Sequence, residues 1–255
     1  MKKMIGLVLV AAFLFSAAIS AMGSAGAEEF HTFRGIPRGI TEEELYEAVY
    51  QACGFRVFST DGEIFTPVPV AGQMITLLGR EAAFCAVMDI DEETLQAIKL
   101  GFSDEYEWPV GARQEEAVRH IPSLAHCAAI LNALAEKYHQ PTYAYVICEP
   151  LSDAEDDAYF VIDGPITNDV LHTVQSLTEE YGVVSLLVCI DNIEFRYDIE
   201  LSSAGGLWVD YELSYFYEED MTFDSLPEDL LTAPKLQTEE SPIDYTVVNK
   251  IDLVL

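Results

Sequence analysis

The stretch from Ile193 to Tyr217 constrains the fold most, because apolar and polar side chains alternate along most of it. In Ile193–Leu201 every second residue is apolar, and Leu207–Tyr217 repeats the alternation. This period is typical of a β-strand that buries one face. The connection Ser202–Gly206 contains two glycines. Two alternating runs joined in this way predict an antiparallel β-hairpin with one face in a core.

The register of this hairpin places charged residues on its polar face. With Leu201 opposite Leu207, the facing pairs are Asp198 with Asp210, Arg196 with Glu212, and Glu200 with Trp208. Two aspartates directly opposite each other disfavour a sheet, so a bound cation, a basic partner or the nearby Arg196 is expected to compensate them.

The candidate binding residues are therefore Asp198, Trp208, Asp210 and Glu212. An acidic surface with an aromatic ring suits a basic or cation-bearing partner, a sugar or a peptide. Plain exposure of these side chains, or a helix that covers them, is the structural alternative.

The remaining chain predicts an α+β fold, an antiparallel sheet covered by helices. Thr41 and Glu44 form a capping-box pattern, so a helix should start at Thr41 and stop at Gly54. The other predicted helices are Asp91–Leu100, Arg113–His139 with an interruption at Pro122, and Pro165 or Ile166 to Tyr181. The other predicted strands are Phe55–Ser59, Ile64–Val70 at a sheet edge, Ala82–Ile90, Tyr143–Cys148, Ala158–Ile162 and Val183–Ile190.

Residues 28–231 are expected to form one domain, followed by a polar connector, 232–242, and a last strand, 243–255. Leu134–Ile147 resembles Leu177–Ile190, and each contains the end of a predicted helix and the strand after it. Repeated helix-then-strand units, with halves 28–110 and 111–231, are therefore one hypothesis for this domain. Chance similarity is the other.

The first 27 residues predict an export signal. Lys2 and Lys3 precede the apolar run Ile5–Ile19, and small residues end the segment at Ala27, as in a secretory signal peptide. An uncleaved N-terminal anchor is the alternative. The mature chain is expected outside the cell or in the periplasm or cell envelope, with no stable membrane span.

The net charge of the chain restricts the classes of partner that it can bind. The formal net charge is −31, from 44 acidic and 13 basic residues. This field repels phosphate backbones and anionic lipid surfaces, so no nucleic-acid partner is expected. A cation or a basic protein is favoured, and solubility alone is the simpler explanation.

The five cysteines are an odd number for an exported chain, so at least one is unpaired or bridges two molecules. Three lie in apolar strand-like runs and two in helix-like runs, which favours buried thiols over a disulfide framework. They are Cys53, Cys85, Cys127, Cys148 and Cys189. A bridge between Cys148 and Cys189 is left open.

The common catalytic motifs do not occur in this sequence. Outside residues 1–27 there is no GxSxG, and the chain has no HExxH, P-loop or strand-associated GxGxxG. No cofactor is expected. Cys127, near the start of an apolar helix, is a candidate nucleophile, although His120 and His126 do not converge on one helix face.

An acidic loop near residue 155 is a candidate for a divalent cation. Its carboxylates are Asp153, Glu155, Asp156 and Asp157. It is no EF-hand, because Ala158 and Gly164 stand where that loop needs Gly and Glu. A solvated loop is the favoured interpretation.

Phe33–Leu45, FRGIPRGITEEEL, resembles the opening of uncharacterised bacterial exported proteins that begin with an FRGIPWG-like segment. The helix before residue 140 and the run Ile199–Glu212, IELSSAGGLWVDYE, are similar to the same proteins. This chain has Arg38 where they have tryptophan and His139 where they have glycine.

The pattern also resembles the helix-then-sheet modules of β-lactamase-inhibitor proteins and outer-membrane-assembly lipoproteins, which implies a binding module without catalytic residues. The sequence thus predicts an exported, non-catalytic binding protein. A cysteine-dependent hydrolase and a cation- or carbohydrate-binding module are the alternatives.

Overall fold

The computed structural model describes residues 30–68, 75–89, 91–107, 122–138, 141–151, 156–201, 206–217 and 226–242. Every described helix and strand lies in the compact unit His31–Leu255. The predicted signal peptide, 1–27, and the predicted last strand, 243–255, lie outside the described residues.

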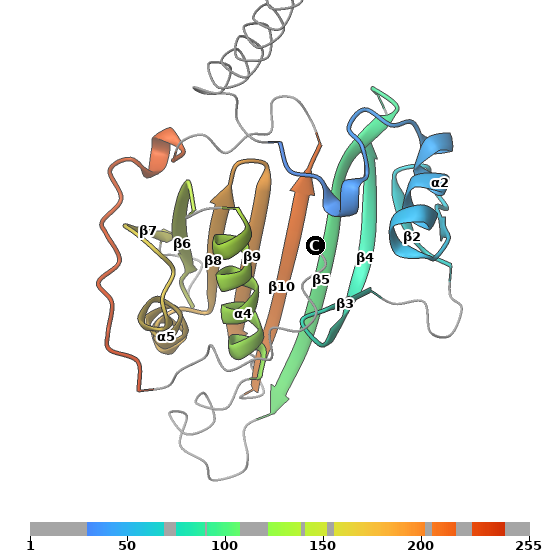
Figure 1. Cartoon of the computed structure of the whole chain (residues 1–255). Helices are drawn as coiled ribbons and strands as arrows, with labels where there is room; N and C mark the ends of the chain where they lie inside the picture. Colours follow the sequence, from blue (N-terminus) through green and yellow to red (C-terminus); the bar gives the residue numbers. More distant parts are fainter. Residues whose placement is uncertain are drawn as a thin grey trace, which may run out of the picture. The chain divides into compact units, whose positions relative to one another are not determined.

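A ten-stranded sheet dominates the described structure (Figure 1). The strands are β1 Val57–Phe58, β2 Ile64–Pro67, β3 Ile75–Leu77, β4 Arg80–Asp89, β5 Thr94–Glu107, β6 Tyr143–Glu149, β7 Ala158–Ile162, β8 Val183–Ile190, β9 Ile193–Leu201 and β10 Gly206–Phe216. Their order is β1-β2-β4-β5-β10-β9-β8-β6-β7, with β3 beside β4. Each of these strand pairs is antiparallel.

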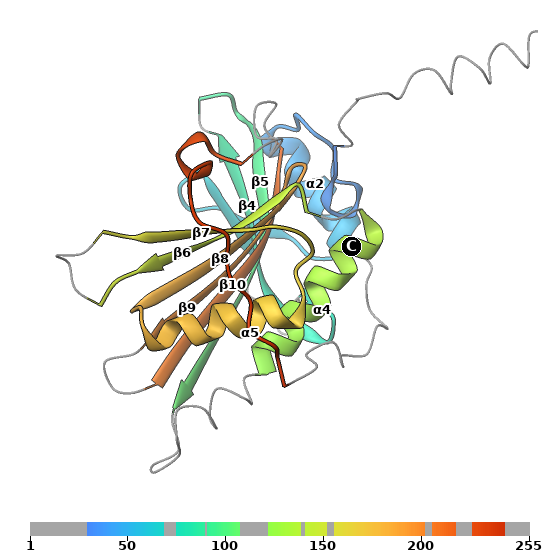
Figure 2. The same cartoon turned by 90° about the vertical axis from the view of Figure 1, so that its left-hand side faces the viewer.

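The helices lie against one face of the sheet (Figure 2). They are α2 Glu42–Cys53, α4 Pro122–Lys137 and α5 Asn168–Ser176, with short 3-10 turns η1 Phe33–Gly35, η2 Leu177–Glu179 and η3 Glu228–Leu230. The capping box at Thr41 and the end of α2 at Gly54 are confirmed; Gly54 has φ 77°, a left-handed conformation that glycine adopts without strain. The described structure is thus α+β.

The predicted hairpin is confirmed, including its register. Leu201 opposes Leu207, and Asp198 opposes Asp210. The apolar side is the centre of the core, since Phe195 and Leu213 are both 0% exposed. We call this helix-covered side the inner face of the sheet and the opposite side the outer face.

The predicted helix Asp91–Leu100 is wrong, because strand β5 begins at Thr94 and continues to Glu107. Leu95 and Ile98 are both buried, and their three-residue spacing resembles that of a helix. The spacing arises where the β4–β5 register shifts, because Met88 pairs with Leu95 but Val87 with Ala97, leaving an extra residue, Gln96, in β5. A β-bulge therefore interrupted the two-residue period.

The two suggested halves share one sheet. β5 lies in residues 28–110 and β10 in 111–231, and they pair continuously from Gly206 opposite Glu107 to Phe216 opposite Ala97. The predicted connector 232–242 follows η3 and lies beside β7, bonded to the backbone of Val161. It is therefore part of the folded unit.

All five cysteines are free thiols in the structure. Cys148 is opposite Val184 and Cys189 is opposite Tyr143. Because these positions differ by an odd number of residues along the ladder, the two cysteines point to opposite faces of the sheet. The open alternative of a Cys148–Cys189 bridge is excluded by this direction.

Candidate functional site

The outer face of the sheet carries the predicted binding residues. Alternation along β9 and β10 turns Asp198, Asp210 and Glu212 to this face, away from the helices. Trp208 lies on it too and is 44% exposed. Since the described helices pack on the inner face (Figure 2), these side chains are open to solvent or half-buried.

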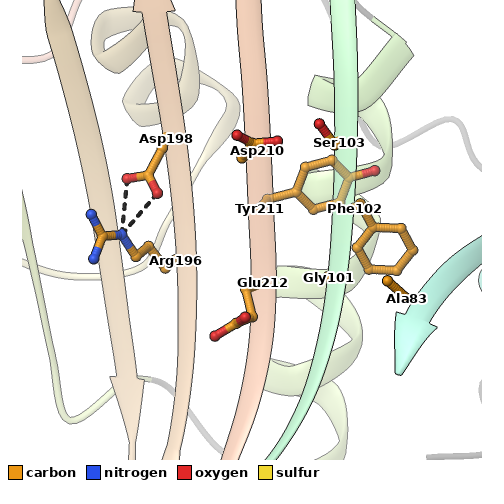
Figure 3. Close-up of a pocket in the computed structure, with 9 residues that line it drawn as sticks. All are labelled: Ala83, Gly101, Phe102, Ser103, Arg196, Asp198, Asp210, Tyr211 and Glu212. Carbon is orange, nitrogen blue, oxygen red and sulfur yellow. Dashed lines mark hydrogen bonds and ion pairs between the residues drawn. The ribbon is translucent and has the colours of Figure 1, made fainter. Parts of the chain in front are cut away.

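A depression of about 460 Å³ lies in the middle of the outer face (Figure 3). It is lined by Ala83, Gly101, Phe102, Ser103, Arg196, Asp198, Asp210, Tyr211 and Glu212. Gly101 has no side chain, and a Cβ added there would meet no atom within 4 Å. A small side chain on β4 and a missing one on β5 therefore leave room beside Glu212, which is opposite Gly101.

Arg196 compensates one of the two facing aspartates. Its Nε donates to both carboxylate oxygens of Asp198, at 2.8 and 3.0 Å. The Asp210 carboxylate, directly across from Asp198, makes no hydrogen bond or ion pair with any residue that the structure describes. Of the two facing aspartates, one is therefore neutralised and the other is open to a ligand (Figure 3).

Glu212 is held by residues that sequence reasoning missed. Lys99 Nζ lies 3.0 Å from Glu212 Oε1, and Ser214 Oγ donates to the same oxygen at 2.7 Å. The register prediction for Arg196 and Glu212 is confirmed, but the Arg196 side chain pairs with Asp198 instead. Lys99 and Gly101 were missed because no strand was predicted over β5, whose first part was taken for the helix Asp91–Leu100.

The pKa of Glu194 depends on burial and on the charges of this face. It lies half-buried on β9, and burial raises the pKa of its carboxyl group. Lys99 and Arg196 oppose this shift, whereas Glu212 and Asp198 reinforce it. Burial is the largest cause of this shift, and the charged neighbours modify it in both directions.

A second depression, of about 660 Å³, lies at the start of α2 and is also acidic. Two of its carboxylates, Asp61 and Asp89, are used by local turns. Asp61 Oδ1 accepts from the Glu63 and Ile64 amides, and Asp89 Oδ1 accepts from the Asp91 and Glu92 amides. These groups therefore stabilise the loops that carry them.

Cys127 is 0% exposed, and burial raises the pKa of its thiol well above the ordinary value. Both ring nitrogens of the neighbouring His126 are already bonded: Nδ1 to the Tyr211 hydroxyl at 2.9 Å and Nε2 to the Leu77 carbonyl at 2.7 Å. The thiol has neither solvent access nor an available base in this neighbour. His120 lies outside the described residues.

The acidic loop is described only in part. Asp153 and Glu155 lie outside the described residues, whereas Asp156 and Asp157 are exposed. Among the residues with described positions, no three His, Cys, Asp or Glu side chains group in a way that could hold a metal ion. None of the described helices has both the length and the apolar character needed to cross a membrane.

Comparison with protein-family models, with curated protein sequences and with solved structures gives no match. The resemblance to exported proteins that open with an FRGIPWG-like segment therefore stays a prediction.

Proposed function

We propose that this protein is a non-catalytic binding protein whose outer sheet face takes a cationic group from a basic partner. The observation that carries the proposal is Asp210: a carboxylate without a described partner, opposite a second aspartate, at an open depression floored by Gly101. An ammonium or guanidinium group placed there would relieve the repulsion between the two strands.

Charge and aromatic surface both favour such a ligand. A net charge of −31 attracts cationic partners over distances up to the screening length, about 8 Å at physiological salt. Trp208, two residues before Asp210 on the same face, offers a ring over which a guanidinium group can stack. Weaker binding at higher salt is therefore expected.

Export and internal duplication are proposed as well. Export through the N-terminal segment fits a protein with an interaction surface and no catalytic motif. Internal duplication fits the order of a helix and then strands, seen with α2 before β1 and with α4 before β6. For the hydrolase alternative, the burial of Cys127 gives no support.

The chain allows a spectroscopic test at the proposed site. It has two tryptophans, Trp108 and Trp208, so a Trp108→Phe variant leaves Trp208 as the only indole. A tetra-arginine peptide should change its fluorescence in a saturable, salt-dependent way. A tetra-glutamate peptide should not.

Matched charge reversals distinguish a site from overall charge. In the Trp108→Phe background, Asp210→Lys should weaken tetra-arginine binding about tenfold, equivalent to ~1.4 kcal/mol. Glu179→Lys alters the net charge equally at an exposed residue of η2 and should change affinity less than about twofold. Equal losses in the two variants would refute a specific site.

A further inference from the structure

A segment near the C-terminus runs along the open edge of the sheet. We call residues 234–241 the strap. The Val161 amide in β7 donates to the Pro234 carbonyl at 2.9 Å, and the Leu236 amide donates to the Val161 carbonyl at 2.8 Å. The pairing of Val161 with Lys235 is parallel. In Figures 1 and 2 the strap passes from β7 toward α5.

The second half of the strap is bonded to α5. The Glu239 amide donates to Thr173 Oγ1 at 2.8 Å, and the Ser241 amide donates to Asp169 Oδ1 at 2.8 Å. At the other end, Lys235 forms an ion pair with Asp163, just after β7. These hydrogen bonds use backbone groups of the strap, and the ion pair uses one charged side chain.

No apolar side chain of the strap is fully buried, and Leu236 is half-buried. Leu230 in η3 is buried and anchors the start of the segment. Every side chain from 231 to 242 is exposed or half-buried, and Lys235 and Asp163 are both largely exposed. Because water can replace each bond, the strap is held far more weakly than a strand in the sheet centre.

We propose that the β7 edge and the adjacent side of α5 form a docking site for an extended peptide of a partner protein, and that the strap is its displaceable internal occupant. This site is separate from the depression on the outer face. Extended peptides commonly bind by adding a strand to a sheet edge. Here the edge is already covered, as exposed edges usually are in native proteins.

The contacts of the strap indicate which features a peptide needs to bind in its place. The incoming chain lies parallel to β7, with a cationic side chain beside Asp163 and a non-proline aliphatic residue next, whose amide bonds to Val161. Two later backbone amides reach Thr173 and Asp169. A second copy of this chain is disfavoured as occupant because two molecules of charge −31 repel each other.

The covalent link explains why the bare protein would bind such a peptide weakly. A tethered segment competes at an effective concentration in the millimolar range for short linkers. A free peptide at micromolar concentration therefore cannot displace it. Weakening the strap without changing its site should expose the binding capacity.

The experiment uses the full chain and a labelled peptide with the sequence of residues 232–242, TAPKLQTEESP. The released variant is Lys235→Glu/Leu236→Pro, which reverses the strap's charge at Asp163 and removes the amide that bonds to Val161. Fluorescence anisotropy should show at least tenfold tighter peptide binding than to the wild type. A peptide with the same two changes should not bind.

The control variant Arg56→Glu/Gln237→Pro makes the same kinds of substitution at two positions that form no described bond to β7 or α5. Arg56 is exposed, and no described residue is bonded to the backbone N–H of Gln237, whose side-chain amide donates to Lys235 O within the strap. It should bind the peptide no better than the wild type. Near-UV circular dichroism checks that both variants are folded.

Hydrogen exchange at the Val161 amide completes the test. Faster exchange in the released variant, reversed by the peptide, supports the proposal. Unchanged protection means that the strap is a fixed part of the fold, and faster exchange without peptide binding means that the edge is no docking site. Concentration-dependent dimers without peptide binding would assign the edge to a second copy. Each of these three results overturns the proposal.

Discussion

Replacing Tyr211 with phenylalanine tests a buried hydrogen-bond chain beneath the candidate site. A carbonyl only accepts, so His126 Nε2 must donate to Leu77, which leaves Nδ1 as an acceptor for the Tyr211 hydroxyl. Arg80 Nη1 in turn donates to the Tyr211 oxygen at 2.7 Å. The donor and the acceptor of each of these hydrogen bonds are therefore fixed.

The cost of the substitution follows from burial. Tyr211 and His126 are each 2% exposed, so in Tyr211→Phe the Nδ1 acceptor loses its donor where little water can replace it. An unsatisfied buried group costs about 1–3 kcal/mol. Arg80 keeps its bond to Asp104 and is partly solvated, and so adds little. The ring of Tyr211, stacked on Phe102 at 4.7 Å, is retained. We expect a loss of about 2 kcal/mol.

Urea unfolding at neutral pH measures this loss. With a denaturant slope of about 2 kcal/mol per molar, the midpoint should fall by roughly 1 M. The control is Tyr50→Phe, which removes a hydroxyl from a side chain 47% exposed on α2 and should leave the midpoint unchanged. Equal midpoints for the Tyr211→Phe and Tyr50→Phe proteins would refute the hydrogen-bond chain.

Three further predictions concern single positions. Gly101→Val should fold with unchanged or slightly higher stability, because its Cβ meets no atom within 4 Å and valine favours strands. It should nevertheless abolish tetra-arginine binding by filling the depression, as Trp208 fluorescence can show. Glu194 has a raised pKa in the folded state, so its stabilising contribution is complete below the unfolded value near 4.5 and is lost as pH rises through the folded value. Glu194→Gln should therefore raise the urea midpoint at pH 7 but not at about pH 4, and a gain at both values would contradict the argument. Cys127, 0% exposed with a raised pKa, should resist a thiol reagent at neutral pH until the protein unfolds. Peptide mapping that finds it labelled in the native state would revive the cysteine-hydrolase alternative.

Much of the fold could be predicted from the sequence, because it depends on the local alternation of apolar residues and on helix caps. The alternation in Ile193–Leu201 and Leu207–Tyr217 fixes which side chains share a face. Those runs and the short connection between them predicted the observed register, down to Asp198 opposite Asp210. The capping box at Thr41 and the glycine at position 54 likewise predicted both ends of α2.

The composition of the site depended on strands that are distant in sequence. β5 was mistaken for a helix because a bulge at Gln96 put its buried residues out of the two-residue period. Without a predicted strand here, neither Lys99 nor Gly101 was assigned to the site, although Lys99 neutralises Glu212 and Gly101 lines the depression. Nothing local records that β5 pairs with β10, since the two strands are separated by about two fifths of the chain.

The sequence by itself therefore determined the acidic hairpin, its inward and outward faces and the net charge that favours cationic partners. Only the tertiary structure decided which face the helices cover, which strand lies beside Asp210, and that residues 234–241 close the β7 edge. The physical reason is that alternation and capping arise within a few residues. Strand pairing across long separations, and pairing through the backbone alone, leave no pattern of side chains to read.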